Sequence, residues 1–190
     1  PGESRSQAEQ VQEHRRNVKT DFDDIVTMSW NLASRGDRDF VEGELVRGAA
    51  DIALIQEMCR WEEASLEVQG TGYRWITTPK SSNGKRLAVA VADDMLRRWT
   101  VRRVRRGTRS MAVLLSDRQM PSLTMLLINF HLPHEELDEE QMQLAIAEVM
   151  AAETLLPCRV LVCGGDMNVE FNEEEEEARR RRGELYFSNP

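Results

Sequence analysis

Short apolar runs alternate with polar segments along most of the chain. Runs of about four to eight residues that are rich in β-branched and aromatic side chains and bounded by Gly, Pro, Asn or Asp are typical of strands. The pattern therefore predicts strands at 24–32, 51–58, 73–78, 86–92, 123–132 and 159–165, and a hairpin of 99–107 with 110–116.

Three segments have a spacing that favours helices instead. In 38–50 the apolar residues approximate one helical face, and 60–70 reads as a short helix ended by Gly70. The clearest helix is 135–156, with acids in its first turn, where the helix dipole favours them. The predicted apolar faces consist of Phe40, Val41, Leu45 and Val46 in the first helix, and Met142, Ile146, Val149 and Met150 in the last.

Many strands with few helices between them indicate an α/β fold in which packed mixed sheets are covered by helices. Residues 23–170 are expected to form this domain. Residues 1–22 are polar without clear periodicity and are predicted to be a mobile leader, and 171–190 form a charged tail. Within that tail, the run at 173–182 pairs glutamates with arginines and favours a solvated helix, or a partner contact through its arginines.

Composition excludes several classes of protein. A chain of 190 residues with 41% hydrophobic content can bury one core. No apolar run approaches the ~20 residues of a membrane span, and the N-terminus lacks a signal-peptide core. A soluble intracellular protein is expected, without a distinction between nucleus and cytoplasm or an indication of oligomeric state. The three cysteines, predicted to be buried thiols, follow no zinc or disulfide pattern.

Positive charge is concentrated in one part of this acidic chain. The net charge is −8, yet 80–109 contains ten basic residues and two acidic ones. Such a segment can bind the phosphate backbone of DNA or RNA. The alternative is a solvated hairpin with arginines on its outer face. The candidate nucleic-acid contacts are Arg102, Arg103, Arg105 and Arg106.

Four of the predicted strands end in polar residues, which are uncommon in a protein interior. Loops at strand ends concentrate function because the sheet fixes their geometry. These strand ends carry Trp30 and Asn31, Gln56 and Glu57, Asn129 and His131, and Asp166 and Asn168.

If the strand ends converge, their side chains suit phosphoryl chemistry. Mg²⁺, or alternatively Mn²⁺, takes oxygen ligands, often from one or two carboxylates, and leaves room for water and substrate phosphate. A second carboxylate can orient or deprotonate water, while amides and imidazole donate hydrogen bonds to phosphate oxygens.

The segments "MSWNL", "DIALIQEM", "INFHLPH" and "GGDMN" resemble, in order and approximate spacing, the motifs of the endonuclease/exonuclease/phosphatase superfamily. This superfamily includes deoxyribonuclease I, inositol polyphosphate 5-phosphatases and the endonuclease domains of non-LTR retrotransposons, to which the chain looks most similar. The resemblance extends from about Asp24 to Asn168. It implies a four-layer α/β sandwich of two packed mixed sheets flanked by helices.

The resemblance also implies a role for each motif residue. Asn31 matches the Asn beside the metal, and Glu57 matches the glutamate that binds magnesium. His131 matches a histidine that contacts phosphate and donates a proton. Asp166 matches the aspartate that orients the attacking water, and Asn168 the asparagine that holds phosphate.

Each of these residues also has a structural interpretation. Glu57 can begin a helix after its strand, and Asp166 with Asn168 is good turn chemistry. His131 and Asn31 can hydrogen-bond to backbone.

The C-terminal part departs from the pattern of the superfamily. Its members carry an Asp-His pair on a later strand, whereas the 22 residues after Asn168 contain neither residue. We therefore expect a sandwich without its C-terminal strands.

The main functional hypothesis is magnesium-dependent phosphodiester hydrolysis of endonuclease type, impaired by the missing pair. One alternative is a phosphatase acting on a phosphorylated small molecule or lipid headgroup. Another is a non-catalytic nucleic-acid-binding remnant of a mobile element.

Overall fold

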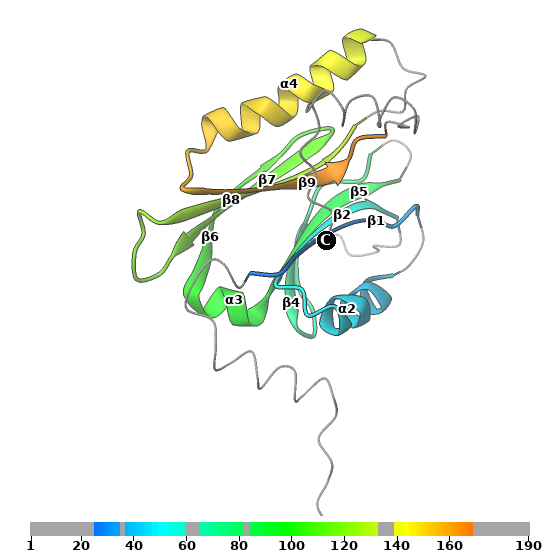
Figure 1. Cartoon of the computed structure of the whole chain (residues 1–190). Coiled ribbons are helices and arrows are strands. Elements are labelled where there is room, and N and C mark those ends of the chain that lie inside the picture. Colours follow the sequence, from blue (N-terminus) through cyan, green and yellow to red (C-terminus); the bar gives the residue numbers. More distant parts are fainter. Residues whose placement is uncertain (1–24, 35–36, 60–64, 82–83, 133–138, 169–190) are drawn as a thin grey trace, which may run out of the picture.

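The computed structural model describes residues 25–34, 37–59, 65–81, 84–132 and 139–168, which form two mixed β-sheets (Figure 1). The first sheet contains, in spatial order, β1 (Thr27–Asn31), β2 (Ile52–Met58), β5 (Arg86–Ala92), β4 (Tyr73–Thr77) and β3 (Glu67–Gln69). The second contains β6 (Trp99–Arg106), β7 (Ser110–Asp117), β8 (Thr124–His131) and β9 (Val160–Asp166).

Each sheet contains one parallel pair of strands. β1 pairs with β2, and β8 pairs with β9, while the other pairings are antiparallel. Parallel strands end at the same edge of a sheet, so each parallel pair brings the ends of two strands together. The predicted hairpin of 99–107 with 110–116 is confirmed as β6 and β7.

The core lies between the two sheets. Leu54 and Val89 of the first sheet belong to the same buried cluster as Val113 and Leu127 of the second. The near-continuous apolar sequence of β2 and β5 is explained by burial on both faces.

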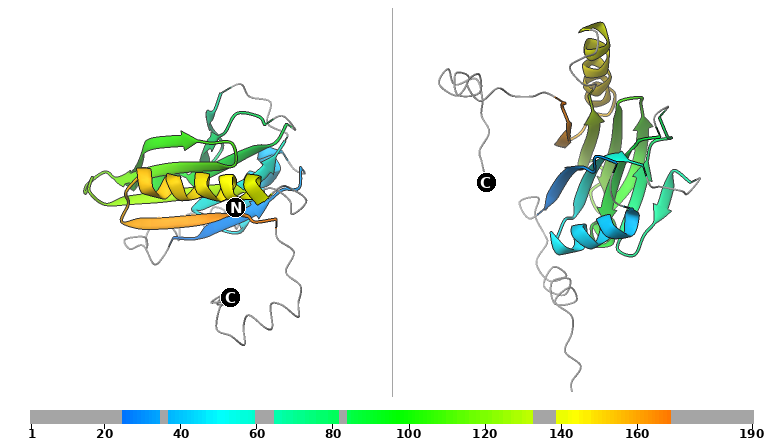
Figure 2. Two further views of the ribbon diagram at one scale, coloured as in Figure 1. Left: turned by 90° about the horizontal axis from the view of Figure 1, so that it is seen from above. Right: turned by 90° about the vertical axis from the view of Figure 1, so that its right-hand side faces the viewer.

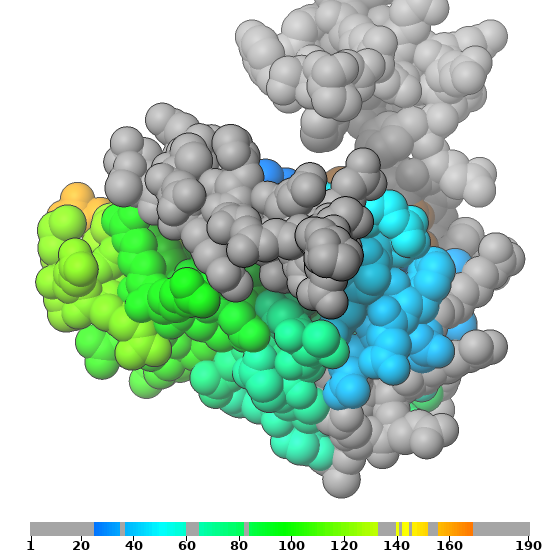
Figure 3. Space-filling model, turned by 90° about the horizontal axis from the view of Figure 1, so that it is seen from below, coloured from blue at the N-terminus to red at the C-terminus, as the bar shows by residue number. Residues whose placement is uncertain are grey.

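Helices cover the outer faces of both sheets, which confirms the four-layer α/β sandwich (Figures 1 and 2). Helix α2 (Arg38–Arg47) lies on the first sheet, with Val41 and Leu45 buried and Asp37 accepting a hydrogen bond from the backbone of Phe40 at its N-terminus. Helix α4 (Glu139–Leu155) covers the second sheet. The short α3 (Asp93–Arg98) connects the sheets and lies on the same face of the molecule as α2 (Figure 3).

The predicted helix at 60–70 is wrong over its described part, because Glu67–Gln69 form β3. The chain passes close to α2 there: a Cβ on Gly70 would lie 1.7 Å from Oε1 of Glu42. Glu42 is only 5% exposed and accepts a hydrogen bond of 2.9 Å from the backbone of Thr71. The predicted face of α2 is correspondingly shifted, since Glu42 is buried while Phe40 is exposed.

The predicted apolar stripe of α4 is only partly buried. Val149 packs against the second sheet, whereas Ile146 and Met150 are exposed. The predicted strand at 159–165 is confirmed as β9, which lies at the edge of its sheet with Leu161 exposed. The leader 1–22, the charged tail 171–190 and the start of the predicted helix at 135–156 lie outside the described residues.

All three cysteines lie in the described part of the chain and none forms a disulfide. Their predicted burial is wrong, since Cys59 and Cys158 are half-buried and Cys163 is exposed. None of the helices within the described ranges is long and apolar enough to cross a membrane.

Candidate active site

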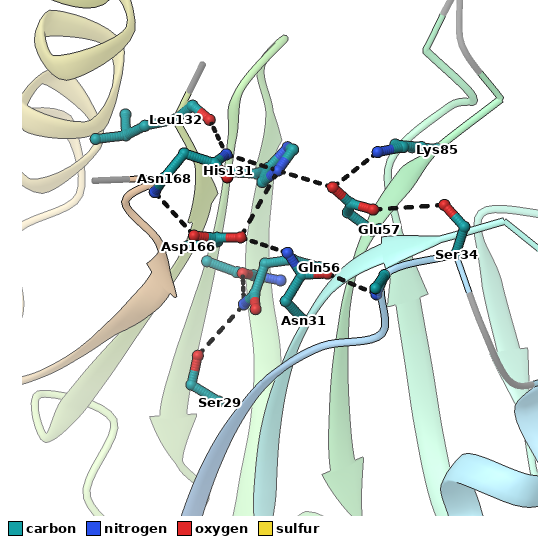
Figure 4. Close-up of polar contacts among 12 residues, drawn as sticks. Ser29, Asn31, Ser34, Gln56, Glu57, Lys85, His131, Leu132, Asp166 and Asn168 are labelled. Carbon is teal, nitrogen blue, oxygen red and sulfur yellow. Dashed lines mark hydrogen bonds and ion pairs between the residues drawn. The ribbon is translucent and has the colours of Figure 1, made fainter. Parts of the chain in front are cut away.

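The four polar strand ends meet at one edge of the sandwich (Figure 4). In the first sheet Asn31 is the register partner of Gln56, the neighbour of Glu57. In the second sheet His131 is the register partner of Asp166. Because the two sheets face each other, the ends of both parallel pairs adjoin. The structure thus brings Asn31, Glu57, His131 and Asp166 together, which is the convergence that the hypothesis of phosphoryl chemistry requires.

A β-bulge directs Glu57 into this site. The pairing of β2 with β5 is regular up to Ile55 and resumes only at Met58, and Glu57 has a φ of 56°. A bulge adds one residue to a strand and re-aims the side chains beside it. A positive φ is unfavourable for a residue with a Cβ, and such strain is concentrated at functional sites. Glu57 is accordingly the only half-buried residue in an otherwise buried β2.

Beneath the site, two buried amides join the sheets. Nε2 of Gln56 donates a hydrogen bond of 2.7 Å to Oδ1 of Asn129. Nδ2 of Asn129 donates to the carbonyl oxygens of Ile55 and Ala88, both at 2.8 Å. These bonds satisfy carbonyl groups at the bulge, so this amide pair fixes the position from which Glu57 projects.

Asp166 is held by two hydrogen bonds. One of its carboxylate oxygens accepts from the side-chain amide of Asn31, and the other accepts from the backbone N–H of Asn168 at 2.8 Å. Asn168 itself has a φ of 48°, and its Nδ2 donates to the carbonyl oxygen of Leu132 at 2.6 Å. The turn after β9 is therefore hydrogen-bonded both to Asp166 and to Leu132 at the end of β8.

His131 lies between the two carboxylates. Its Nε2 is 3.2 Å from Oε1 of Glu57, 4.0 Å from Oδ2 of Asp166 and 3.0 Å from Nδ2 of Asn168. When this nitrogen carries a proton it donates to Glu57, and when it does not it accepts from Asn168. The imidazole can therefore exchange a proton without moving.

Burial lowers the pKa of His131 below its ordinary value, because the interior disfavours the charged ring. The negative charges of Glu57 and Asp166 raise the pKa in opposition, and the positive charges of Lys85 and Arg109 lower it.

A cleft of about 500 Å³ opens beside Glu57 and His131. Its walls come from the loop between β4 and β5, the start of β5 and the turn between β6 and β7. Among the described residues that line it, Glu57 supplies one carboxylate and five side chains are basic: Lys80, Lys85, Arg86, Arg106 and Arg109.

The four arginines predicted to bind nucleic acid lie on β6 in different surroundings. Arg102 and Arg103 are exposed on this edge strand. Arg105 donates to the carbonyl oxygen of Ala151 in α4 at 3.2 Å. Arg106 donates to the carbonyl oxygen of Thr77 and pairs with Glu67, and of the four it alone lines the cleft. The structure therefore does not gather the four arginines at the site.

The sequence matches the Endonuclease/Exonuclease/phosphatase family over residues 28–186, which is most of the chain. The chain belongs to this family. Members of the Endonuclease/Exonuclease/phosphatase family are hydrolases that act on phosphoesters and generally depend on divalent metal ions. No curated protein sequence matches the chain significantly.

Solved structures of the Endonuclease/Exonuclease/phosphatase fold match the chain at low identity. The endonuclease domain of TRAS1, a telomere-specific non-LTR retrotransposon, has a TM-score of 0.56 and 17% identity, covering 82% of this chain and 68% of that one. TDP2 from C. elegans has a TM-score of 0.51 and 20% identity, covering 80% and 49%. Mannosyl-6-phosphatase Bt3783 from Bacteroides thetaiotaomicron has a TM-score of 0.52 and 15% identity, covering 84% and 71%. These similarities establish the fold alone, and the chain spans about half of the length of this TDP2.

The donors at the site fit a divalent ion held by few protein ligands. Within the described ranges, His, Cys, Asp and Glu side chains do not form a group of three that could hold a metal. Mg²⁺ does not require such a group, because it is commonly held by one or two carboxylates together with water and substrate phosphate. Glu57 supplies a carboxylate at the wall of the cleft, 13% exposed.

Asn31, the second proposed metal residue, already uses both ends of its amide. Its Oδ1 accepts from the backbone of Ala33 at 2.7 Å, and its Nδ2 donates to Asp166. This geometry favours a role in orienting Asp166, and ligation through the remaining lone pair of Oδ1 stays a proposal.

Four basic residues of the cleft were not among the predicted site residues: Lys80, Lys85, Arg86 and Arg109. Nζ of Lys85 lies 2.7 Å from Oε1 of Glu57, and Arg86 lines the cleft next to it. Their neighbourhood in the sequence, Gly-Lys-Arg before an apolar run, is typical of a turn that precedes a strand. Only the pairing of β2 with β5 shows that this turn faces the bulge.

Proposed function

We propose that this chain is a magnesium-dependent phosphodiesterase of endonuclease type that acts on DNA, with Mn²⁺ as an alternative metal ion. The observation that supports this most directly is the convergence of Glu57, His131 and Asp166 beside a cleft lined by basic side chains. Two carboxylates on either side of an imidazole provide a position for a cation, a base and an acid within one site.

Asp166 is the group that we propose orients the attacking water. Hydrogen bonds from Asn31 and from the backbone of Asn168 hold its carboxylate in one orientation. A base that is fixed in this way loses little entropy when water is positioned against the phosphorus. Asn31 acts in this proposal as a positioning residue for Asp166.

His131 and Asn168 are proposed to contact the phosphate. Nδ2 of Asn168 and Nε2 of His131 lie 3.0 Å apart, so both can reach one phosphate group. A phosphate adds negative charge beside the imidazole and raises its pKa, which favours the protonated ring as a hydrogen-bond and proton donor. Donors of this kind stabilise the charge that develops on the phosphate oxygens in the transition state.

Glu57, with Asn31 at the same edge, is proposed to hold the metal ion. When bound there, Mg²⁺ would offset negative charge on the phosphate and on the leaving oxygen. The carboxylate of Glu57 is positioned for this by the bulge in β2. Among the described residues, its Oε2 accepts one long hydrogen bond, of 3.4 Å from Oγ of Ser34.

A nucleic-acid substrate is supported by the charge of the cleft. Its basic residues come from three separate segments, so an extended polyanion could lie along them. Some structures with this fold are of proteins whose names include DNA chemistry, such as the TRAS1 endonuclease domain and a TDP2 complex with single-strand DNA product. RNA has the same backbone charge and is the alternative polymer.

Nicking of a supercoiled plasmid in MgCl₂ tests this proposal. We expect conversion to the open circle that is abolished by EDTA and reduced roughly 10²-fold or more by Glu57→Gln or Asp166→Asn. Glu44→Gln is the matched control, because Glu44 pairs with Arg47 on α2. Nicking that persists in EDTA or in Glu57→Gln would refute the proposal.

A phosphatase on a phosphorylated small molecule is a second candidate, favoured by the limited volume of the cleft. The sugar phosphatase from Bacteroides shares the fold. Release of inorganic phosphate from mannose 6-phosphate without nicking would favour this candidate. Salt-sensitive plasmid binding without either reaction would instead favour a non-catalytic nucleic-acid-binding protein.

A further inference from the structure

Arg86 is a buried cation at the wall of the cleft. It is the first residue of β5 and only 9% exposed. Among the described residues, its guanidinium makes one hydrogen bond, from a terminal nitrogen to the carbonyl oxygen of Thr78 at 3.3 Å, and its Nε is buried without a partner. Within the described ranges, acidic side chains do not pair with it.

Two other partly buried arginines of this chain have acidic partners. Arg98 pairs with Asp117 at 2.6 Å, and Arg106 pairs with Glu67 at 3.3 Å. Both are more exposed than Arg86, so their charges are also better hydrated. A guanidinium that is buried without a counter-charge is unfavourable in free energy, which makes its placement at a cleft informative.

The position of Arg86 relates it directly to the candidate active site. It is the register partner of Met58, the residue after Glu57, and it follows Lys85, whose ammonium group contacts Glu57. Arg86 and Glu57 line the same cleft. An anion bound by Arg86 would therefore lie beside the group hydrolysed at Glu57 and His131.

We propose that Arg86 binds a second anionic group of the substrate, a phosphate that is not hydrolysed. This inference rests on the proposed function, because the position of the reacting phosphate is taken from it. The guanidinium is suited to this role, since it presents several N–H donors in a plane that matches two phosphate oxygens. The substrate class that follows is one with two neighbouring phosphates, as in a polynucleotide backbone.

Binding measured in EDTA tests the role of Arg86 without hydrolysis. The two probes are thymidine 3′,5′-bisphosphate and thymidine 5′-monophosphate, titrated calorimetrically into the full chain. We expect the wild type to bind the bisphosphate more tightly than the monophosphate. Arg86→Gln should weaken bisphosphate binding about tenfold or more, which is the effect of losing one charge-assisted hydrogen bond. Binding of the monophosphate should change less than about twofold.

Two further variants test whether the effect is specific to Arg86 and to its guanidinium group. Arg102→Gln is the matched control, since Arg102 is exposed on β6 and does not line the cleft. Arg86→Lys keeps the charge without the planar donors and should restore part of the preference for the bisphosphate. A folded Arg86→Gln that binds the bisphosphate as tightly as the wild type overturns the inference.

Thermal unfolding separates ligand binding from a role in folding. Because Arg86 is an unmatched buried cation, Arg86→Gln should keep or raise the Tm without ligand and lose the increase in Tm that the bisphosphate gives the wild type. If Arg86→Gln does not fold, the Nε–H resonance of Arg86 in the wild type decides. A shift of this resonance on titration with the bisphosphate supports the inference, and an unchanged resonance overturns it.

Failure of this inference is distinguishable from failure of the proposed function. Equal binding of both probes with metal-dependent nicking intact would refute the second phosphate site alone. A preference for the bisphosphate that depends on Arg86, in a chain that does not nick DNA, would support the site and refute the endonuclease.

Discussion

The ammonium group of Lys85 lies 2.7 Å from Oε1 of Glu57, the carboxylate that we propose holds the metal ion. A lysine at this distance neutralises the charge that attracts a divalent cation and occupies one of its ligand atoms. Lys85→Met should therefore strengthen Mn²⁺ binding by roughly three- to tenfold, in line with the small energy of a partly exposed ion pair. Calorimetric titration with MnCl₂ measures this directly.

Lys80→Met is the matched control for this experiment, because Lys80 lines the same cleft but its ammonium does not contact Glu57 within the described residues. An Mn²⁺ affinity that falls in Lys85→Met would mean that the ammonium supports the site. The hypothesis that Lys85 competes with the metal ion for the carboxylate of Glu57 would then be refuted.

The pKa of His131 should be below its ordinary value and should depend on Glu57. Burial lowers the pKa, and the charge of Glu57 raises it in opposition. Glu57→Gln should therefore lower the pKa of His131 further, as measured by an NMR titration of the imidazole without metal. An increase in this variant would contradict the arrangement of charges.

The lowered pKa of His131 also makes the stability of the fold depend on pH. The pKa of histidine in the unfolded chain is about 6.5, so as the pH falls the unfolded state binds the proton before the folded state does. The contribution of His131 to the free energy of unfolding is therefore complete above a pH of about 6.5 and is lost as the pH falls through the lower folded pKa. His131→Asn should reduce this dependence in urea unfolding series recorded between neutral and mildly acidic pH.

The buried amide pair beneath the site should matter for stability. Gln56→Leu keeps the volume of the side chain but leaves Oδ1 of Asn129 without its donor at 2.7 Å. An unsatisfied buried acceptor costs about 1–3 kcal/mol, so the free energy of unfolding in urea should fall by that amount. Gln119→Leu on the exposed turn after β7 is the control and should change stability little. Equal stabilities of the two variants would show that water replaces the lost bond.

The sequence predicts the convergence of the site because the relevant signals are local. Asn31, Glu57, His131 and Asp166 each follow an apolar run, and strands in packed sheets that run in parallel end at one edge. The order of the four motifs then indicates which strand ends belong together. The bulge at Glu57 has no such signal, because it is a property of the pairing between β2 and β5.

Residues whose role depends on tertiary contacts were not predictable in this way. The segment 60–70 has the charged, alanine-containing sequence of a helix, but Glu67–Gln69 within it form β3 and pair with β4. Likewise, Arg86 reads as part of a basic turn, and only the fold shows that it is buried without a carboxylate partner in the described part of the chain. The four arginines of β6 look equivalent in the sequence, but they have different surroundings in the structure.

The conformation of the turn between β6 and β7 should depend on one acidic residue of α4, Glu148. Glu148 accepts hydrogen bonds from the backbone N–H groups of Thr108, Arg109 and Ser110, at 3.2, 2.9 and 2.7 Å. This turn lines the cleft, and Arg109 also shares a backbone bond with His131. Glu148 also accepts a hydrogen bond of 2.8 Å from Oγ of Ser110. Glu148→Ala removes all four charge-assisted bonds at once, so we expect a loss of about 1–3 kcal/mol in the free energy of unfolding.

The loss in Glu148→Ala should be accompanied by weaker binding of thymidine 3′,5′-bisphosphate, because the cleft wall that carries Arg109 is no longer held. Glu140→Ala is the control on the same helix, since Glu140 is exposed and lies two turns away from Glu148. Amide hydrogen exchange at residues 108–110 provides the local measurement: it should accelerate in Glu148→Ala alone. Unchanged exchange there would show that the turn is held by the pairing of β6 with β7, and that α4 does not shape the cleft.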